Sequence, residues 1–175
     1  MLRARLTALA TTAALAGMLL GSLSAAQAET ATAGLKSADG KDVGTVTLTE
    51  TPHGVLLSLS VKGLPPGEHA FHVHAVGKCE PPFTTAGGHF NPEGKKHGLE
   101  NPDGCHAGDM LNFTVDAKGV AKATIVNKNV NLGSDTHSLF SNGGTALVIH
   151  AKADDMKTDP EGNAGDRIAC GVVPK

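Results

Sequence analysis

The sequence lacks tryptophan and tyrosine altogether and has only five phenylalanines among its 175 residues. Its hydrophobic core must therefore rest mainly on Val, Leu, Ala and Ile, which is typical of a small β-sandwich or β-barrel. Convincing helical periodicity, internal repeats and signs of a second domain are also missing after residue 28. These absences indicate one all-β domain.

Long apolar runs are missing too, apart from one at the N-terminus. This run covers about residues 6–23, carries no charge, and follows Arg3 and Arg5. It leads to Ala26-Gln27-Ala28, the small-x-small pattern of a cleavage site. The pattern predicts a secretory signal peptide. A transmembrane anchor and a buried helix are the alternatives, but the run is borderline in length for a membrane span and rich in small residues.

We therefore assign residues 1–28 to a cleaved signal peptide and residues 29–175 to the mature domain. No cysteine directly follows the expected cleavage site, which argues against a lipoprotein anchor. Export to the periplasm, or onward secretion, is the expected localisation.

Positive charge is scarce in the mature domain. Of the 15 Lys and Arg residues, two lie in the predicted signal, which leaves 13 against 17 Asp and Glu and a formal net charge of −4. This balance argues against general binding to nucleic acids or to anionic membranes. We expect neither as a partner of the mature form.

Cysteine is limited to Cys79, Cys105 and Cys170. An exported chain enters an oxidising compartment, so we expect one disulfide and one remaining thiol. The sequence allows three pairings. Cys79 with Cys170 would close the longest loop, which in the chain-entropy model contributes about 4–5 kcal/mol.

Alternating apolar and polar residues, separated by Gly, Pro and Asp-Gly turn signals, predict eight strands. They cover about residues 31–37, 43–49, 55–61, 70–74, 110–115, 120–127, 145–152 and 167–173. This pattern is typical of an eight-stranded antiparallel Greek-key β-barrel or sandwich. Two irregular segments, about 76–109 and 153–166, are too long for ordinary connections and are expected to be functional loops.

The strand Ala70-Phe71-His72-Val73-His74 stands out. Successive side chains on a strand point to opposite faces, so Phe71 and Val73 share one face and His72 and His74 the other. The two imidazoles are expected about 6.6–6.8 Å apart. Such a pair is half of a transition-metal site.

The sequence contains nine histidines, more than packing in a small domain normally uses. His53 and His137 are expected to be ordinary surface residues. Six of the others divide by position into a strand set, in which His150 joins the pair above, and a loop set of His89, His97 and His106, which lies with Asp109. A site made only of imidazoles favours copper. Three histidines and a carboxylate suit structural zinc, and Gly108 is expected to permit a sharp turn before Asp109.

With these histidines and their neighbours, the sequence resembles the copper,zinc superoxide dismutases of the exported bacterial kind. The resemblance covers the whole mature chain and rests on five ordered blocks. They are Gly67-Glu68-His69-Ala70-Phe71-His72-Val73-His74, Ala86-Gly87-Gly88-His89-Phe90-Asn91-Pro92, His106-Ala107-Gly108-Asp109, Val148-Ile149-His150-Ala151-Lys152-Ala153-Asp154-Asp155 and Gly162-Asn163-Ala164-Gly165-Asp166-Arg167-Ile168-Ala169-Cys170-Gly171.

The resemblance implies one copper and one zinc per subunit, held by two ligand sets that share one histidine. The copper ligands implied are His72, His74, His89 and His150. The zinc ligands implied are His89, His97, His106 and Asp109.

Other roles follow from the resemblance as well. It implies that Asp154 accepts hydrogen bonds from His72 and His97, and that Cys79 and Cys170 form the disulfide. Arg167 corresponds to the arginine beside the copper, which attracts the anionic substrate. Lys157 is a weaker candidate for steering that substrate, because it is equally well read as an ordinary surface lysine.

The activity implied is the dismutation of superoxide to oxygen and hydrogen peroxide, as antioxidant defence in the cell envelope. In the family scheme copper changes oxidation state, zinc does not, and His89 takes up and returns a proton. The oligomeric state implied is a monomer or a homodimer. The competing hypotheses are a copper-binding module without turnover and a disulfide-linked structural sandwich.

Overall fold

The computed structural model describes residues 28–175. The predicted signal peptide lies outside the described residues, apart from Ala28. Within 28–175, no helix has the length and apolar character needed to cross a membrane.

The described chain forms nine strands and two short 3₁₀ turns. The strands are β1 (Thr30–Ser37), β2 (Asp42–Thr51), β3 (Gly54–Lys62), β4 (Gly67–His69), β5 (Phe71–His74), β6 (Phe113–Val115), β7 (Val120–Asn127), β8 (Ala146–His150) and β9 (Arg167–Val172). The turns are η1 (Thr84–Ala86) and η2 (Ser141–Gly143). The prediction of an all-β antiparallel fold is confirmed.

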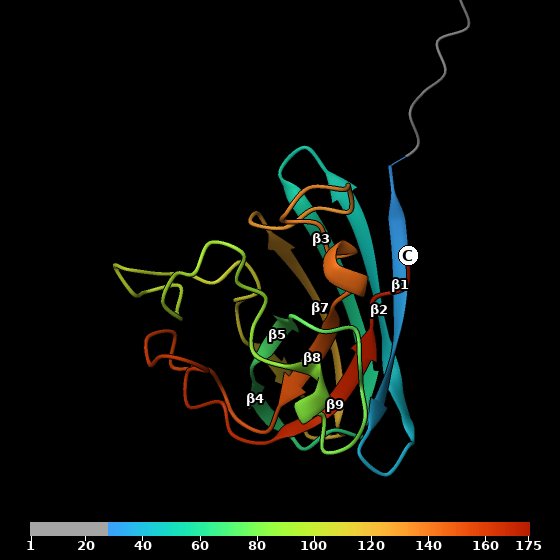
Figure 1. Ribbon diagram of the computed structural model, residues 1–175. Helices are drawn as coiled ribbons and strands as arrows, with labels where there is room; N and C mark the ends of the chain where they lie inside the picture. Colours follow the sequence, from blue (N-terminus) through green and yellow to red (C-terminus); the bar gives the residue numbers. More distant parts are fainter. Residues whose placement is uncertain (1–27) are drawn as a thin grey trace, which may run out of the picture.

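Seven strands pair into one sheet in the order β5-β8-β9-β1-β2-β3-β7, and β4 pairs with β6. The sheet curls strongly, and two long loops extend from the same side of it (Figure 1). These loops, residues 75–112 in yellow-green and 151–166 in orange-red, correspond to the two predicted functional loops.

Each of the eight predicted strands is present. The fourth, 70–74, corresponds to β5, which pairs with β8, and the structure adds β4 directly before Ala70, which pairs with β6. At the junction the Ala70 amide donates to the carbonyl of Lys152 (2.8 Å), and its own carbonyl accepts from the amide of His150 (3.0 Å). One continuous extended segment therefore contributes two strands because its pairing partner changes.

The predicted strand 110–115 is shorter in the structure, where β6 begins at Phe113. The preceding residue, Asn112, pairs with the backbone of Asp154 instead of a neighbouring strand. Its Nδ2 donates to the Asp154 carbonyl (2.9 Å), and its Oδ1 accepts from the Asp154 amide (2.9 Å). This contact joins the two long loops.

The main core lies inside the curled sheet and consists largely of Val, Leu, Ala and Ile, as predicted. On β3, the alternating residues Val55, Leu57, Leu59 and Val61 are all buried. Their burial follows from the period-two pattern of the strand.

Strands β5 and β8 are buried on both faces. One face places Phe71, Val73, Leu147 and Ile149 in the main core. The opposite face carries the histidines and is covered by the long loop. A second apolar cluster fastens the loop there, formed by Phe83, Ala86, Ala146, Val148 and Cys170.

The disulfide joins Cys79 in the long loop to Cys170 in β9, with Cα atoms 5.6 Å apart. This is the pairing that closes the longest of the three possible loops, and the pairing that the family resemblance implies. Cys105 remains a free, partly buried thiol, and Asn129 Nδ2 lies 3.5 Å from its Sγ.

Candidate metal centre

The backbone of the long loop is hydrogen-bonded to the strand that carries His72 and His74. Phe90 donates to the carbonyl of Val73 (2.8 Å), and the Val73 amide donates to the carbonyl of Gly108 (3.0 Å). His89 is thereby held beside β5, where it forms an isolated bridge with His74. Two segments of the loop are thus positioned by a strand that is itself rigidly buried.

Gly108 is needed because the loop backbone passes close to the backbone of β5 at this point. It is not needed for the sharp turn that the sequence suggested. A Cβ atom at this position would lie 2.2 Å from the carbonyl oxygen of Val73, and Gly108 is not among the glycines with positive φ. Any larger residue would push the segment that bears His106 and Asp109 away from β5.

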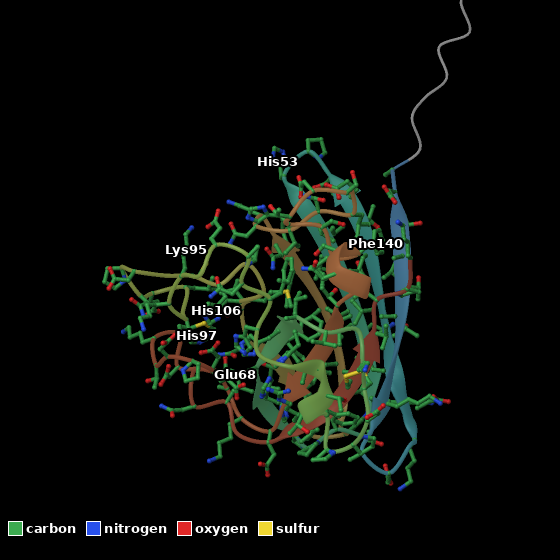
Figure 2. The ribbon with its side chains drawn as sticks, in the orientation of Figure 1. His53, Glu68, Lys95, His97, His106 and Phe140 are labelled. Carbon is green, nitrogen blue, oxygen red and sulfur yellow. A yellow bond between two sulfur atoms is a disulfide. The ribbon has the colours of Figure 1, made fainter. Side chains whose placement is uncertain are left out.

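The sequence-predicted ligands come together as two buried sets whose donor atoms lie within 4.8 Å of one another in each set. One set is formed by His72, His74, His89 and His150, and the other by His89, His97, His106 and Asp109. Figure 2 shows His97 and His106 where the two long loops meet. His89 belongs to both sets.

In the first set, the ring nitrogens that face away from the centre are occupied. His72 Nε2 lies 2.8 Å from Asp154 Oδ2, His74 Nδ1 donates to the carbonyl of Gly87 (2.9 Å), and His150 Nδ1 donates to that of Gly165 (3.2 Å). A carbonyl can only accept, so these contacts fix the tautomers. The remaining nitrogens carry lone pairs and point inward.

The inward nitrogens do not satisfy one another. His74 Nε2 and His150 Nε2 lie 3.3 Å apart although both are acceptors, and His72 Nδ1 and His89 Nε2 are buried with no hydrogen-bond partner. Converging buried lone pairs are unfavourable unless a cation lies between them. Four imidazole nitrogens are a donor set that fits copper.

The second set converges on Asp109 Oδ1. His89 Nδ1, His97 Nδ1 and His106 Nδ1 lie 2.8, 3.0 and 3.4 Å from this oxygen. The other carboxylate oxygen accepts from the amides of Gly98 (2.9 Å) and His106 (3.0 Å), which fixes its direction. Three imidazoles and one carboxylate form a closed set that fits tetrahedral zinc.

Asp154 lies between the two sets. Its Oδ2 is 2.8 Å from His72 Nε2 and its Oδ1 is 3.0 Å from His97 Nε2. Gly162 permits this packing, because a Cβ atom there would lie 1.8 Å from Asp154 Oδ1. One carboxylate therefore orients a ligand of each metal.

Burial and local charge give the histidines different proton affinities. Burial lowers the pKa of His89 and of His150 to about 4, so both stay neutral at pH 7. Burial also lowers the pKa of His97, but hydrogen bonds to Asp109 and Asp154 outweigh it and raise that pKa to about 9. The same contacts hold the pKa of both carboxyls far below the usual range, despite burial.

Zinc binding to the metal-free protein is therefore expected to release about one proton from His97 at pH 7.5, since a metal ligand must be deprotonated. Because the raised pKa keeps this proton bound only below about 9, the release is expected to disappear as the pH rises through that value. Calorimetry of zinc binding in buffers of different ionisation enthalpy measures the released protons. A release that does not change between pH 7.5 and 10 would contradict the assignment.

Arg167 begins β9 and pairs in register with His150. Its Nη1 donates to the carbonyl of Phe83 (2.9 Å), its Nη2 donates to Glu161 Oε1 (2.8 Å), and only 13% of its side chain is exposed. It lines a surface pocket of about 530 Å³ together with Gly165, whose carbonyl accepts from His150 Nδ1. Lys157 does not line this pocket; it is exposed and its Nζ lies 2.9 Å from Glu100. A steering role for Lys157 stays a prediction.

Two polar contacts near the site were not predicted from the sequence. Glu161 binds Arg167, and Asn112 fixes Asp154 across 42 residues of sequence. His53 and His137, expected to be surface residues, lie outside both metal sets. His69 is buried but packs away from the metals, with its ring nitrogens each 2.8 Å from a backbone carbonyl.

The fold and the site define an all-β metalloprotein with two adjacent buried metal sites joined by one histidine. Residues 43–173 match the family model described as copper/zinc superoxide dismutase. The chain belongs to the copper/zinc superoxide dismutase family.

Relatives cover nearly the whole chain. It is 53% identical over 167 residues to a Cu-Zn superoxide dismutase of Aquifex aeolicus, covering 91% of this chain and 98% of the relative. It is 48% identical over 147 residues to a Cu-Zn superoxide dismutase of Caulobacter vibrioides, covering 82% and 84%.

Solved structures agree with this assignment. The Cu/Zn superoxide dismutase of Brucella abortus superposes with a TM-score of 0.68 at 31% identity, covering 83% of this chain and 100% of the other. A SOD-like protein from Bacillus subtilis superposes with a TM-score of 0.79 at 36% identity, covering 82% and 97%.

Proposed function

We propose that this protein is an exported enzyme that dismutes superoxide to oxygen and hydrogen peroxide, with antioxidant defence in the cell envelope as its role. The observation that carries the proposal is the pair of complete donor sets that share His89, with Arg167 beside the first set. Copper in the first set supplies the one-electron chemistry by which two superoxide ions and two protons become oxygen and hydrogen peroxide.

The protein's own residues bind the substrate and manage protons. Arg167 offers a guanidinium to an anion arriving beside His150. His89 Nε2 is a buried atom with no partner in the protein, and it is the atom that would carry the proton which the family resemblance assigns to this histidine. Asp154 orients His72 and His97, which limits rearrangement of either ligand set.

Export rests on the N-terminal pattern and is supported by the Cys79–Cys170 disulfide, which suits an oxidising compartment. We place the mature domain in the periplasm, with secretion as the alternative, and as a monomer or homodimer. Its net negative charge argues against nucleic acids and anionic membranes as partners and repels superoxide overall, so attraction of that anion has to be local, at Arg167.

The test is superoxide decay followed by stopped flow for residues 29–175 loaded with copper and zinc, compared with the zinc-only form. Rapid, copper-dependent decay is expected. Fully metallated protein that does not exceed spontaneous decay would show a copper-binding module instead.

In the same assay, Arg167→Ala is expected to reduce the rate about tenfold or more and to weaken its dependence on salt, since focused positive charge raises association rates by roughly 10–10³. Arg167→Lys keeps the charge and is expected to keep the salt dependence. Lys157→Ala tests the weaker candidate, and an equal loss in that variant would move the steering role away from Arg167.

A further inference from the structure

The guanidinium that faces the proposed substrate site is already occupied by a carboxylate. Glu161 Oε1 accepts from Arg167 Nη2 at 2.8 Å, and the Glu161 side chain is 40% exposed. Burial raises the pKa of Glu161, but the charge and hydrogen bond of Arg167 outweigh it and lower that pKa. Glu161 is therefore ionised at neutral pH and neutralises its partner.

Among the described residues that line this pocket, Arg167 is the only cation, and it is outnumbered by acids. The pocket is lined by Pro82, Thr84, Glu161, Gly165, Asp166 and Arg167. No other arginine occurs after residue 28. An anion that enters must therefore compete with the Glu161 carboxylate for the positive charge of a single guanidinium.

The loop that carries Glu161 is held in place. Asp155 accepts from the amides of Lys157 (3.0 Å) and Thr158 (2.8 Å) and from Asn163 Nδ2 (2.8 Å). The amide of Gly162, directly after Glu161, donates to the Thr158 carbonyl (2.7 Å). Glu161 is presented to Arg167 by an internally bonded loop rather than by a chance surface contact.

We propose that Glu161 is a specificity-determining residue, whose carboxylate competes with small anions for the Arg167 guanidinium and so sets their affinity at the copper site. This inference deepens the proposed function and rests on it. The carboxylate offsets the positive charge that an anion meets at Arg167, which weakens the binding of competing anions and also limits capture of the substrate.

The test is titration of the copper- and zinc-loaded protein with azide, followed by the azide-to-copper absorption band. Glu161→Gln keeps the shape of the side chain and removes its charge. A partly exposed ion pair contributes up to about 1 kcal/mol, so the azide dissociation constant is expected to fall about threefold to fivefold. Superoxide decay is measured separately on the same samples.

Asp166→Asn is the matched control. Asp166 lines the same pocket, is exposed, and makes no side-chain hydrogen bond to Arg167. Its effect on azide binding is expected to be smaller and to vanish near 1 M salt, where the screening length is about 3 Å. The effect of Glu161→Gln is expected to persist there, because the contact is direct.

A second measurement does not need a metal. Phenylglyoxal modifies arginine, and Arg167 is the only arginine of residues 29–175, so the mass of the intact protein reports on this residue alone. Glu161→Gln is expected to accelerate modification and Asp166→Asn to leave it near the wild-type rate. The proposal would be overturned if Glu161→Gln and Asp166→Asn changed azide binding equally at low salt and near 1 M salt. Equal effects of the two variants on the rate of arginine modification would overturn it as well. Loss of superoxide decay with the azide difference intact would overturn the proposed function alone.

Discussion

Replacing His150 with alanine is expected to abolish copper-dependent superoxide decay. His150 supplies one of the four inward-facing nitrogens of the first set, and its Nε2 lies 3.3 Å from that of His74. The variant leaves every ligand of the second set in place. Metal analysis after loading is therefore expected to show zinc retained and copper lost or weakly held, with near-complete loss of activity by stopped flow.

His53→Ala is the matched control for this variant. His53 is an exposed histidine in the turn between β2 and β3, labelled in Figure 2, and it belongs to neither donor set. Its replacement is expected to change neither metal content nor activity. A His150→Ala protein that keeps wild-type activity would contradict the assignment of the first set as the copper site.

Replacing Asp154 with asparagine is expected to weaken both metal sites. The two carboxylate oxygens accept from His72 and His97, 2.8 and 3.0 Å away. An amide of the same shape offers one acceptor and one NH₂ group, so one imidazole N–H would face a donor. Removing such an orienting partner typically reduces metal affinity or activity by about 10–100-fold.

Competition with a chelator measures the two metal affinities of Asp154→Asn separately. Asp42→Asn makes the same charge change on an exposed residue of β2 and is expected to leave both affinities unchanged. Wild-type affinity for copper and zinc in Asp154→Asn would show that the bridging carboxylate is dispensable.

The strand pattern was accessible from the sequence because period-two alternation is a local property. The alternation in β3 and the two faces of β5 were predicted residue by residue, and Phe71 and Val73 do enter the core. The separate strand β4 before Ala70 was not predictable in this way, since it depends on pairing with the distant strand β6.

The two metal sets were predicted from histidine spacing together with the family resemblance. The ring orientations were not, because they depend on carbonyls of other segments, such as Gly87 for His74 and Gly165 for His150. The contact between Glu161 and Arg167 also escaped prediction, since a single glutamate in a polar loop carries no local signal of its partner.

The most direct test of the account is whether the two metals are coupled through His89, which belongs to both donor sets. The protein is loaded with Cu(II) in the first set and Co(II) in place of zinc in the second, and the copper EPR signal is compared with that of the Cu(II)/Zn(II) form. A shared imidazole couples the two spins, so the copper signal is expected to disappear in the cobalt form and to be intact in the zinc form. A full copper signal with both sites occupied would contradict the shared histidine.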